Sequence, residues 1–227
     1  MAVRDALLLA MTVATGAVDV VSYVRLGRVF TANMTGNLVL LGISGGAGRG
    51  RDALLSAMAL LGFAVGALLG ALFLHPGRAR GPLWPPRVTI ALAAEVVLLS
   101  GFEVGWQLTH ARPEGAALFV LIIASALAMG VQSAATRRLT GSAISTTYLT
   151  GMLTVLMEAL AASPRRPAEL LRPAAALLAL VTGALLGAVL LSQAPLLTPL
   201  LSATTLGAVT IVAALYFRQK GHGHHCG

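Results

Sequence analysis

The amino-acid sequence predicts an all-α membrane protein, a polytopic bundle of transmembrane helices, and three observations carry this prediction. Of the 227 residues, 57% are hydrophobic and only 11% are charged, whereas soluble domains carry about 25% charged residues. The mean hydropathy is +0.85, and apolar runs recur along the whole chain. Because a spanning helix needs about 20 predominantly apolar residues, the spans use nearly the full length. We therefore expect a single membrane domain over residues 1–227, without enzymatic activity and without a cofactor.

The apolar runs are bounded by Gly, Pro and Arg and lie at about 5–24, 38–46, 53–74, 88–108, 115–136, 148–162, 174–192 and 196–217. Six of them are long enough to cross a bilayer. The runs at 38–46 and 148–162 are shorter and have polar openings, over residues 31–37 and 145–151. Proline suits the first turn of a helix, so we expect helices to begin near Pro85-Pro86, Pro113, Pro173 and Pro195. We expect residues 218–227 to form a flexible tail.

An internal repeat organises these runs. Three segments match in order, each at an offset of about 115 residues: Gly16-Ala-Val-Asp19 with Gly130-Val-Gln-Ser133, Thr35-Gly36-Asn-Leu38 with Thr150-Gly151-Met-Leu153, and Gly66-Ala-Leu-Leu-Gly70-Ala with Gly183-Ala-Leu-Leu-Gly187-Ala. We therefore predict two homologous halves, over about 4–109 and 115–217. The first run follows Arg4 like a signal peptide, but its counterpart in the middle of the chain favours a retained helix.

The basic residues indicate topology. Sixteen Lys and Arg against eight acidic residues give a net charge of +8, and no basic face interleaved with aromatic residues points to nucleic acid as a partner. Cytoplasmic loops accumulate Lys and Arg. If all eight runs cross, the basic residues divide nine to seven. If the two short runs enter and return on one side, the division becomes eleven to five, with the five outside being Arg25, Arg28, Arg49, Arg51 and Arg112.

The second model predicts six full spans plus two short polar-headed helices, with both termini in the cytoplasm. Three spans per half is an odd number, so the two halves would be inverted relative to each other. Inverted halves are typical of secondary transporters, which place their site at the midplane near broken or short helices. An eight-span model would give parallel halves and weaken this inference.

Asp19 is the strongest single candidate for a functional residue. A charge inside a bilayer costs about 2.5–3.5 kcal/mol on insertion scales, so an ionisable group there is a functional candidate by default. Asp19 lies inside the first run, where Thr12, Gly16 and Tyr23 share its helical face. It would bind a cation, a proton or a polar solute. The alternative is a helix-packing carboxylate that is neutralised by protonation or held by Arg25.

Glu95 stands near the middle of the fourth run, where burial favours the neutral acid. It is either a proton-coupling carboxyl or a neutral side chain bonded to a neighbouring helix. Glu103 is closer to the end of that run. Glu158 lies near the end of its own run, and we expect it to anchor the interface near Arg165 and Arg166.

The polar openings of the two short runs are the most informative feature. A helix that begins at membrane depth offers unpaired N–H groups and the positive end of its dipole to a solute. The candidate solute-binding residues are therefore Asp19, Tyr23, Asn33, Thr35, Gly36 and Asn37, with Thr147, Thr150 and Gly151 in the second half. Ordinary capping of a helix start by Thr or Asn is an alternative, and it is compatible with solute binding.

Glycines at spacings of four residues let helices approach closely. They recur in the third and seventh runs, at Gly62, Gly66, Gly70, Gly183 and Gly187. We expect them to pack the two halves together, with assembly of a homo-oligomer as the lesser alternative.

The tail carries His222, His224, His225 and the single cysteine, Cys226. One cysteine excludes an intrachain disulfide and a zinc site built on cysteine pairs. The histidines are metal-binding residue types, but their spacing imposes no geometry, so we expect no specific metal site.

One stretch resembles a known family. Gly16-Ala-Val-Asp19, Ser22-Tyr23 and the run from Leu26 to Leu38, with Phe30-Thr-Ala-Asn33-Met-Thr35-Gly36-Asn37 at its centre, resemble the signature of the YoaK-like family of bacterial membrane proteins, a domain family of unknown function. The resemblance implies a polytopic protein of the bacterial inner membrane and implies no activity.

The residues together predict passage of a small polar solute or ion, by carrier or channel, through a site between the halves. In this hypothesis Asp19 binds the solute, Asn33, Thr35 and Asn37 supply hydrogen bonds, and Glu95 couples a proton. The alternative is a non-transporting scaffold or sensor that associates through its glycine faces. The lipid bilayer is the other expected partner.

Overall fold

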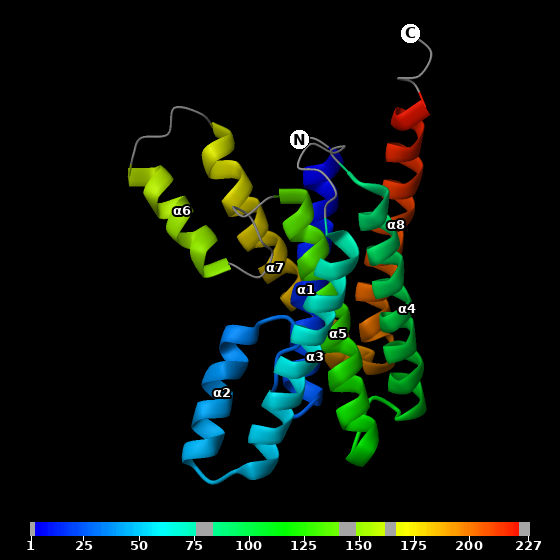
Figure 1. The fold of residues 1–227 in the computed structure, drawn as a ribbon. Helices are drawn as coiled ribbons and strands as arrows, with labels where there is room; N and C mark the ends of the chain where they lie inside the picture. The colour runs from blue at the N-terminus through cyan, green and yellow to red at the C-terminus, as the bar shows by residue number, and fades with distance from the viewer. Residues whose placement is uncertain (1–2, 76–83, 141–148, 162–166, 223–227) are drawn as a thin grey trace.

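The computed structural model describes residues 3–75, 84–140, 149–161 and 167–222, which are almost entirely helical and contain no strand (Figure 1). The helices are α1 (Val3–Arg25), α2 (Met34–Gly46), α3 (Gly50–Leu74), α4 (Pro86–Leu108), α5 (Gly115–Thr140), α6 (Leu149–Ala161), α7 (Pro167–Gln193) and α8 (Thr198–His222). A 3₁₀ turn over Pro195–Leu197 joins the last two. The predicted all-α class is confirmed.

Six of these helices are long and apolar enough to cross a membrane, as predicted. They are α1, α3, α4, α5, α7 and α8, whereas α2 and α6 have 13 residues each. Such a length is too short for the roughly 20 residues that a full span needs. The chain is therefore a six-span helical bundle with two additional short helices.

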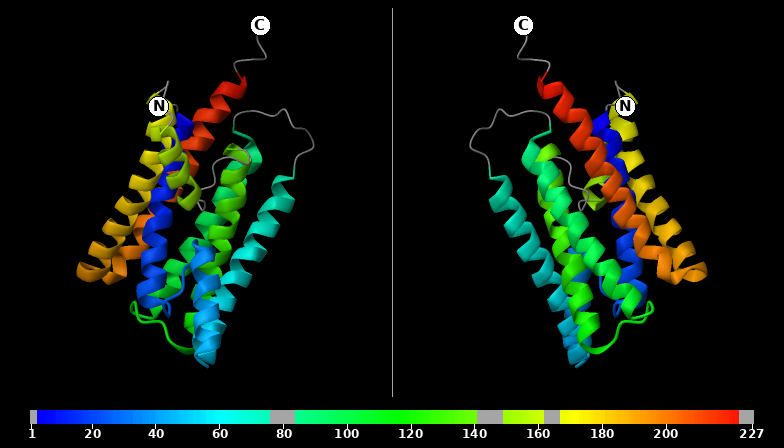
Figure 2. Two further views of the ribbon diagram at one scale, coloured as in Figure 1. Left: turned by 90° about the vertical axis from the view of Figure 1, so that its left-hand side faces the viewer. Right: turned by 90° about the vertical axis from the view of Figure 1, so that its right-hand side faces the viewer.

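The two short helices begin near mid-height of the bundle. In Figure 1, the chain leaves the lower end of α1, returns upward, and then descends through α2 to the lower end again. The start of α6 also lies near mid-height, but α6 runs to the upper end, and the side views in Figure 2 agree. The two short helices thus lead from the middle of the molecule to opposite ends.

The predicted helix starts are only partly confirmed. α2 begins at Met34 within the predicted polar opening, and Asn33 caps it. α7 begins at Pro167, and Pro173 lies inside the helix instead of at its start. Pro167 takes the first helical position, where the missing N–H costs nothing. Pro86 occupies the first turn of α4 as expected.

The helix contacts form a matched pattern. The most extensive contacts join α3 with α5 and α1 with α7, and further contacts join α4 with α5, α1 with α8, α2 with α3 and α6 with α7. If α1, α2, α3 and α4 are taken to correspond to α5, α6, α7 and α8, each of these contacts corresponds to another of them. α1 runs downward in Figure 1 and α5 runs upward, the relation that an inverted repeat requires. The duplication itself stays a prediction.

Burial separates a central pair of helices from a lipid-facing shell. More than half of the apolar window of α1 and of α5 is buried (56% each), against 28% for α3 and α7 and 22% for α8. The exposed faces of the outer helices are rich in Leu and Val, such as Leu61 and Leu68 on α3 and Leu178 and Leu185 on α7. Side chains of this kind suit contact with lipid, so any polar site is expected around α1 and α5.

Candidate functional site in the bundle interior

Asp19 fixes the chain segment that returns to mid-height. Its Oδ1 accepts hydrogen bonds from the backbone N–H groups of Thr31, at 3.1 Å, and Ala32, at 2.8 Å. Backbone groups at membrane depth must be satisfied inside the protein because hydrocarbon offers no partner. The carboxylate supplies that partner from the neighbouring helix. No ion pair joins Asp19 to Arg25 within the described residues.

Asn37 holds the same segment from the other side. Its Oδ1 accepts from the N–H of Phe30 at 2.9 Å, and its Nδ2 donates to the carbonyl of Phe30 at 2.5 Å. The side chain is fully buried. The Phe30 ring stacks on Tyr23, with 4.9 Å between ring centroids, and covers Gly36 so closely that a Cβ there would lie 2.9 Å from Phe30 Cδ2. A side chain at position 36 would therefore have to displace the Phe30 ring.

Asn33 caps the start of α2. Its Oδ1 accepts a hydrogen bond from the Gly36 N–H at 3.3 Å, and the side chains of Asn33 and Thr35 are otherwise exposed. An N–H group at a helix start that is bonded to a capping side chain is no longer available to a solute. Of the predicted binding residues in the first half, Asp19, Asn33 and Asn37 thus bond the chain itself.

The second short helix has different residue types at the positions that make these bonds in the first half. In the sequence match, Ser133 stands in the place of Asp19 and Met152 in the place of Asn37. Gly151 is exposed near the start of α6. Thr150 is the second residue of α6, and Glu158 is exposed on the same helix. The Thr150 side chain, Thr147, Arg165, Arg166 and the histidine tail from residue 223 onward lie outside the described residues.

The glycines pack one half against the other. A Cβ at Gly66 would overlap the carbonyl of Leu127 on α5, and one at Gly183 would overlap the carbonyl of Val13 on α1. Gly62 and Gly70 also face α5, and Gly187 faces Ala17 on α1. The partner positions are themselves glycines, Gly130 on α5 and Gly16 on α1, whose packing role the spacing rule did not identify. Close helix approach between the halves explains all of them.

Glu95 is the least compensated polar side chain that the structure describes. It is fully buried on α4, and neither carboxyl oxygen has a hydrogen-bond partner in the described part of the chain. It lies between Leu92 and Leu99, which belong to the larger hydrophobic cluster. An isolated carboxylate in such surroundings is strongly disfavoured unless it is paired or protonated.

Gln132 on α5 is a second buried polar group in this interior. Its Nε2 donates to Thr15 Oγ1 on α1 at 2.8 Å, while its Oε1 has no partner within the described residues. Thr15 donates in turn to the carbonyl of Met11. Sequence reasoning missed Gln132 and Thr15. The signal was present, because a glutamine in the middle of a 26-residue apolar helix is as unusual as a carboxylate there.

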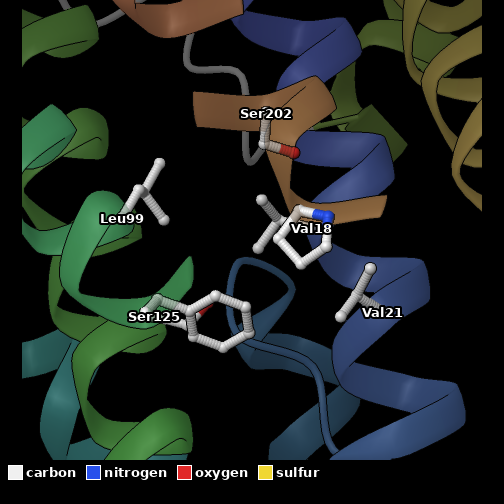
Figure 3. Close-up of a pocket in the computed structure, with 7 residues that line it drawn as sticks. Val18, Val21, Leu99, Ser125 and Ser202 are labelled. Atoms are coloured by element: carbon white, nitrogen blue, oxygen red, sulfur yellow. The ribbon is translucent and has the colours of Figure 1, made fainter. Parts of the chain in front are cut away.

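A small cavity lies between α1, α4, α5 and α8, lined on α4 by Leu99, one turn from Glu95. Its volume is about 10 Å³, room for about one water molecule. Figure 3 shows Leu99 and Ser125 on one side of the cavity and Val18, Val21 and Ser202 on the other. Ser125 donates to Thr31 Oγ1 at 3.0 Å, and Ser202 donates to the carbonyl of Ala14 at 3.3 Å. This cavity is therefore lined by two hydroxyl groups and is too small for a solute larger than water.

One end of this interior is fixed by α4. The indole of Trp106 is fully buried and donates from Nε1 to the carbonyl of Pro195 at 2.9 Å. Gln107 Nε2 donates to the carbonyl of Leu196 at 2.8 Å. These bonds attach the end of α4 to the turn between α7 and α8. No cluster of three or more metal-ligating side chains occurs among the residues that the structure describes.

These features define a multi-pass helical membrane protein with a polar interior between its halves. Residues 7–212 match the model of a family described as "Protein of unknown function (DUF1275)", and the chain belongs to this family. It is 40% identical over 157 residues to the UPF0700 transmembrane protein YoaK of Bacillus subtilis (strain 168), an alignment that covers 69% of this chain and 67% of the relative. The predicted YoaK-like resemblance is confirmed. No solved structure matches the chain.

Proposed function

We propose that the protein passes a small polar solute or ion across the bacterial cytoplasmic membrane through a site between its two halves, and that it is not an enzyme. The observation that carries this proposal is the placement of α2 and α6, which begin near mid-height and run to opposite ends of the bundle (Figures 1 and 2). Short helices that start at the midplane between inverted halves are a recurrent feature of transporter sites.

The interior between α1, α4, α5 and α8 is the proposed place of passage. It holds Glu95, Gln132, Thr15 and the small cavity near Ser202. Buried polar groups are costly in the hydrocarbon region and tend to line solute or ion pathways. Because the cavity holds about one water molecule, this conformation corresponds to a closed state, and passage requires the halves to move.

The first short helix is assigned a supporting role in this proposal. The N–H groups of Thr31 and Ala32, which would otherwise attract an anion, already bond the Asp19 carboxylate. An anionic solute that approached these N–H groups would compete with the Asp19 carboxylate, which carries a charge of the same sign. The arrangement therefore favours a neutral or positively charged solute, with Asn33 and Thr35 as the exposed polar side chains at the start of α2.

The scaffold alternative depends on glycine faces that are free to bind another molecule. Gly62, Gly66, Gly70, Gly183 and Gly187 each face a helix of the same chain, so they support internal packing more directly than association. A homo-oligomer would have to use other surfaces.

We retain the topology predicted from charge, with the upper end of Figure 1 in the cytoplasm, because the five basic residues assigned outside lie at the lower connections.

A flux measurement tests the proposal. Liposomes that contain the purified protein would be incubated with a panel of radiolabelled cations, sugars, polyols and amino acids, and their uptake would be compared with that of protein-free liposomes and of liposomes with a Gly66→Leu variant. We expect saturable uptake of at least one neutral or cationic solute by the wild-type protein alone. Equal, non-saturable leakage in all three preparations would contradict a transport function and favour the scaffold.

A further inference from the structure

Glu95 has no counter-charge in the helices that surround it. α4 packs on α5, α8 and, less extensively, α3. Residues 116–136 of α5, 198–215 of α8 and 53–74 of α3 contain no ionisable side chain. The charged or titratable groups on these helices lie toward their ends: Arg87 and Glu103 on α4, Arg137 and Arg138 on α5, Tyr216, Arg218, Lys220 and His222 on α8, Arg51 and Asp52 on α3. Glu103 bonds Gln107 at 2.5 Å.

Helix register places Gln132 at the level of Glu95. α4 and α5 run in opposite directions, and a Cβ at Gly105 would lie 2.8 Å from Leu121 Cδ2. Ten residues back along α4 lead to Glu95, and ten residues forward along α5 lead to Val131, the neighbour of Gln132. Both side chains are buried, and the apolar residues near them on their own helices, Leu92 and Leu99 on α4 and Met129 and Val131 on α5, belong to one hydrophobic cluster.

The two side chains leave three buried oxygens without a hydrogen-bond partner in the described part of the chain. The amide nitrogen of Gln132 donates one of its two N–H groups to Thr15, whereas its Oε1 and both oxygens of Glu95 have no partner there. Thr15 on α1 uses its own proton on Met11. Three buried acceptors without a partner require a donor. The smallest species that supplies one is a proton, which converts the carboxylate to a neutral carboxylic acid with an O–H to donate.

We infer that Glu95, facing the level of Gln132, is a reversible proton-binding site, and that its proton is taken up and released as the halves open and close. The inference rests on the proposed transport function and names its coupling species. Uptake joins one proton to one carboxylate oxygen, and release returns that proton to water with no other bond broken. The cavity one turn away, beside Leu99, has room for the water that would relay it.

Infrared difference spectroscopy tests the site without knowledge of the solute. Purified wild-type protein in lipid would be compared with Glu95→Gln, a neutral isostere of the protonated acid, and with Glu103→Gln as a matched control on the same helix. We expect a carbonyl band of a protonated carboxyl that shifts in D2O, decreases reversibly as the pH is raised while the protein stays folded, disappears in Glu95→Gln and persists in Glu103→Gln. Gln132→Leu should retain the band and shift its frequency.

Three results would overturn the inference. They are absence of the band in the wild type, a band that persists at every pH up to unfolding, and a rise in melting temperature caused by Na⁺ or K⁺ relative to choline that is lost in Glu95→Gln. The second describes a permanently neutral structural acid, and the third a metal-cation site. A titrating band in a protein that passes no solute in liposomes would instead contradict the proposed function and leave the proton site standing.

Discussion

Asn37 pairs with the backbone of Phe30 through two hydrogen bonds, accepting at 2.9 Å and donating at 2.5 Å. A primary amide reproduces the donor and acceptor of a peptide group. The buried Asn37 side chain therefore supplies both hydrogen bonds that a neighbouring strand would otherwise supply to Phe30. The bonds explain why an asparagine stands at this position, four residues after the asparagine that caps α2.

Replacement of Asn37 by Asp should destabilise the protein. An ionised aspartate would place an acceptor against the Phe30 carbonyl, leaving a buried charge and an unsatisfied oxygen at a cost of several kcal/mol. We expect a lower melting temperature in detergent and faster hydrogen exchange at residues 26–33. Thr35→Ala, which alters an exposed side chain in the same turn, serves as the control. A melting temperature equal to that of the wild type would contradict the described pairing.

Asp19→Ala should loosen the same segment from the α1 side. Two backbone N–H groups would lose an acceptor, and hydrogen bonds to charged groups contribute about 2 kcal/mol each. Asp19→Asn keeps a carbonyl oxygen for both donors and should retain most of the stability. Melting curves of the two variants measure this difference in stability. If Asp19→Asn abolishes flux while both variants melt like the wild type, Asp19 binds solute directly, as the sequence alone suggested.

The effect of a glycine substitution on stability should depend on whether the glycine faces another helix. Gly66→Ala places a methyl group against the Leu127 carbonyl, and overpacking costs about 1–3 kcal/mol. Gly101→Ala on α4 meets nothing within 4 Å and should stabilise its helix by up to about 1 kcal/mol. Thermal unfolding of the protein in detergent measures both. Equal melting temperatures for the two variants would mean that α3 and α5 are not in close contact.

Trp106→Phe should detach α4 from the turn between α7 and α8. The substitution removes the bond to the Pro195 carbonyl but retains most of the buried ring, so we expect a loss of about 1 kcal/mol and faster hydrogen exchange around residues 193–198. Trp84→Phe is the matched control because Trp84 bonds Thr89 at a different place. Unchanged exchange in the Trp106 variant would argue against this attachment.

Hydrophobic patterning predicted the helices well because lipid selects apolar length directly. The run at 53–74 and the helix Gly50–Leu74 agree within three residues, and the two short helices were expected from their polar openings. The interior was harder to predict. The partners of Asp19 are backbone groups twelve and thirteen residues away, and no side-chain pattern encodes which donors a returning loop leaves unsatisfied.

The pairs of helix positions that pack together also could not be predicted from the sequence. The spacing of Gly66 and Gly183 indicated close approach, but their partners Gly16 and Gly130 lie on helices without a repeated glycine motif. The polar relation of Gln132 with Thr15 joins residues 117 apart. Such contacts depend on which helices become neighbours, and helix order in the chain does not fix that.

Cysteine labelling tests the central claim, that α2 and α6 return to opposite sides between inverted halves. Single cysteines would be placed in a Cys226→Ser background at Arg28, between α1 and α2, and at Arg51, Arg137 and Ala161, near helix ends, and probed in bacterial cells with an impermeant maleimide. Arg28→Cys and Arg51→Cys should label together from outside, and Arg137→Cys and Ala161→Cys only after permeabilisation. Labelling of positions 28 and 51 from opposite sides would mean that α2 crosses the membrane, which contradicts the inverted arrangement and the site between the halves.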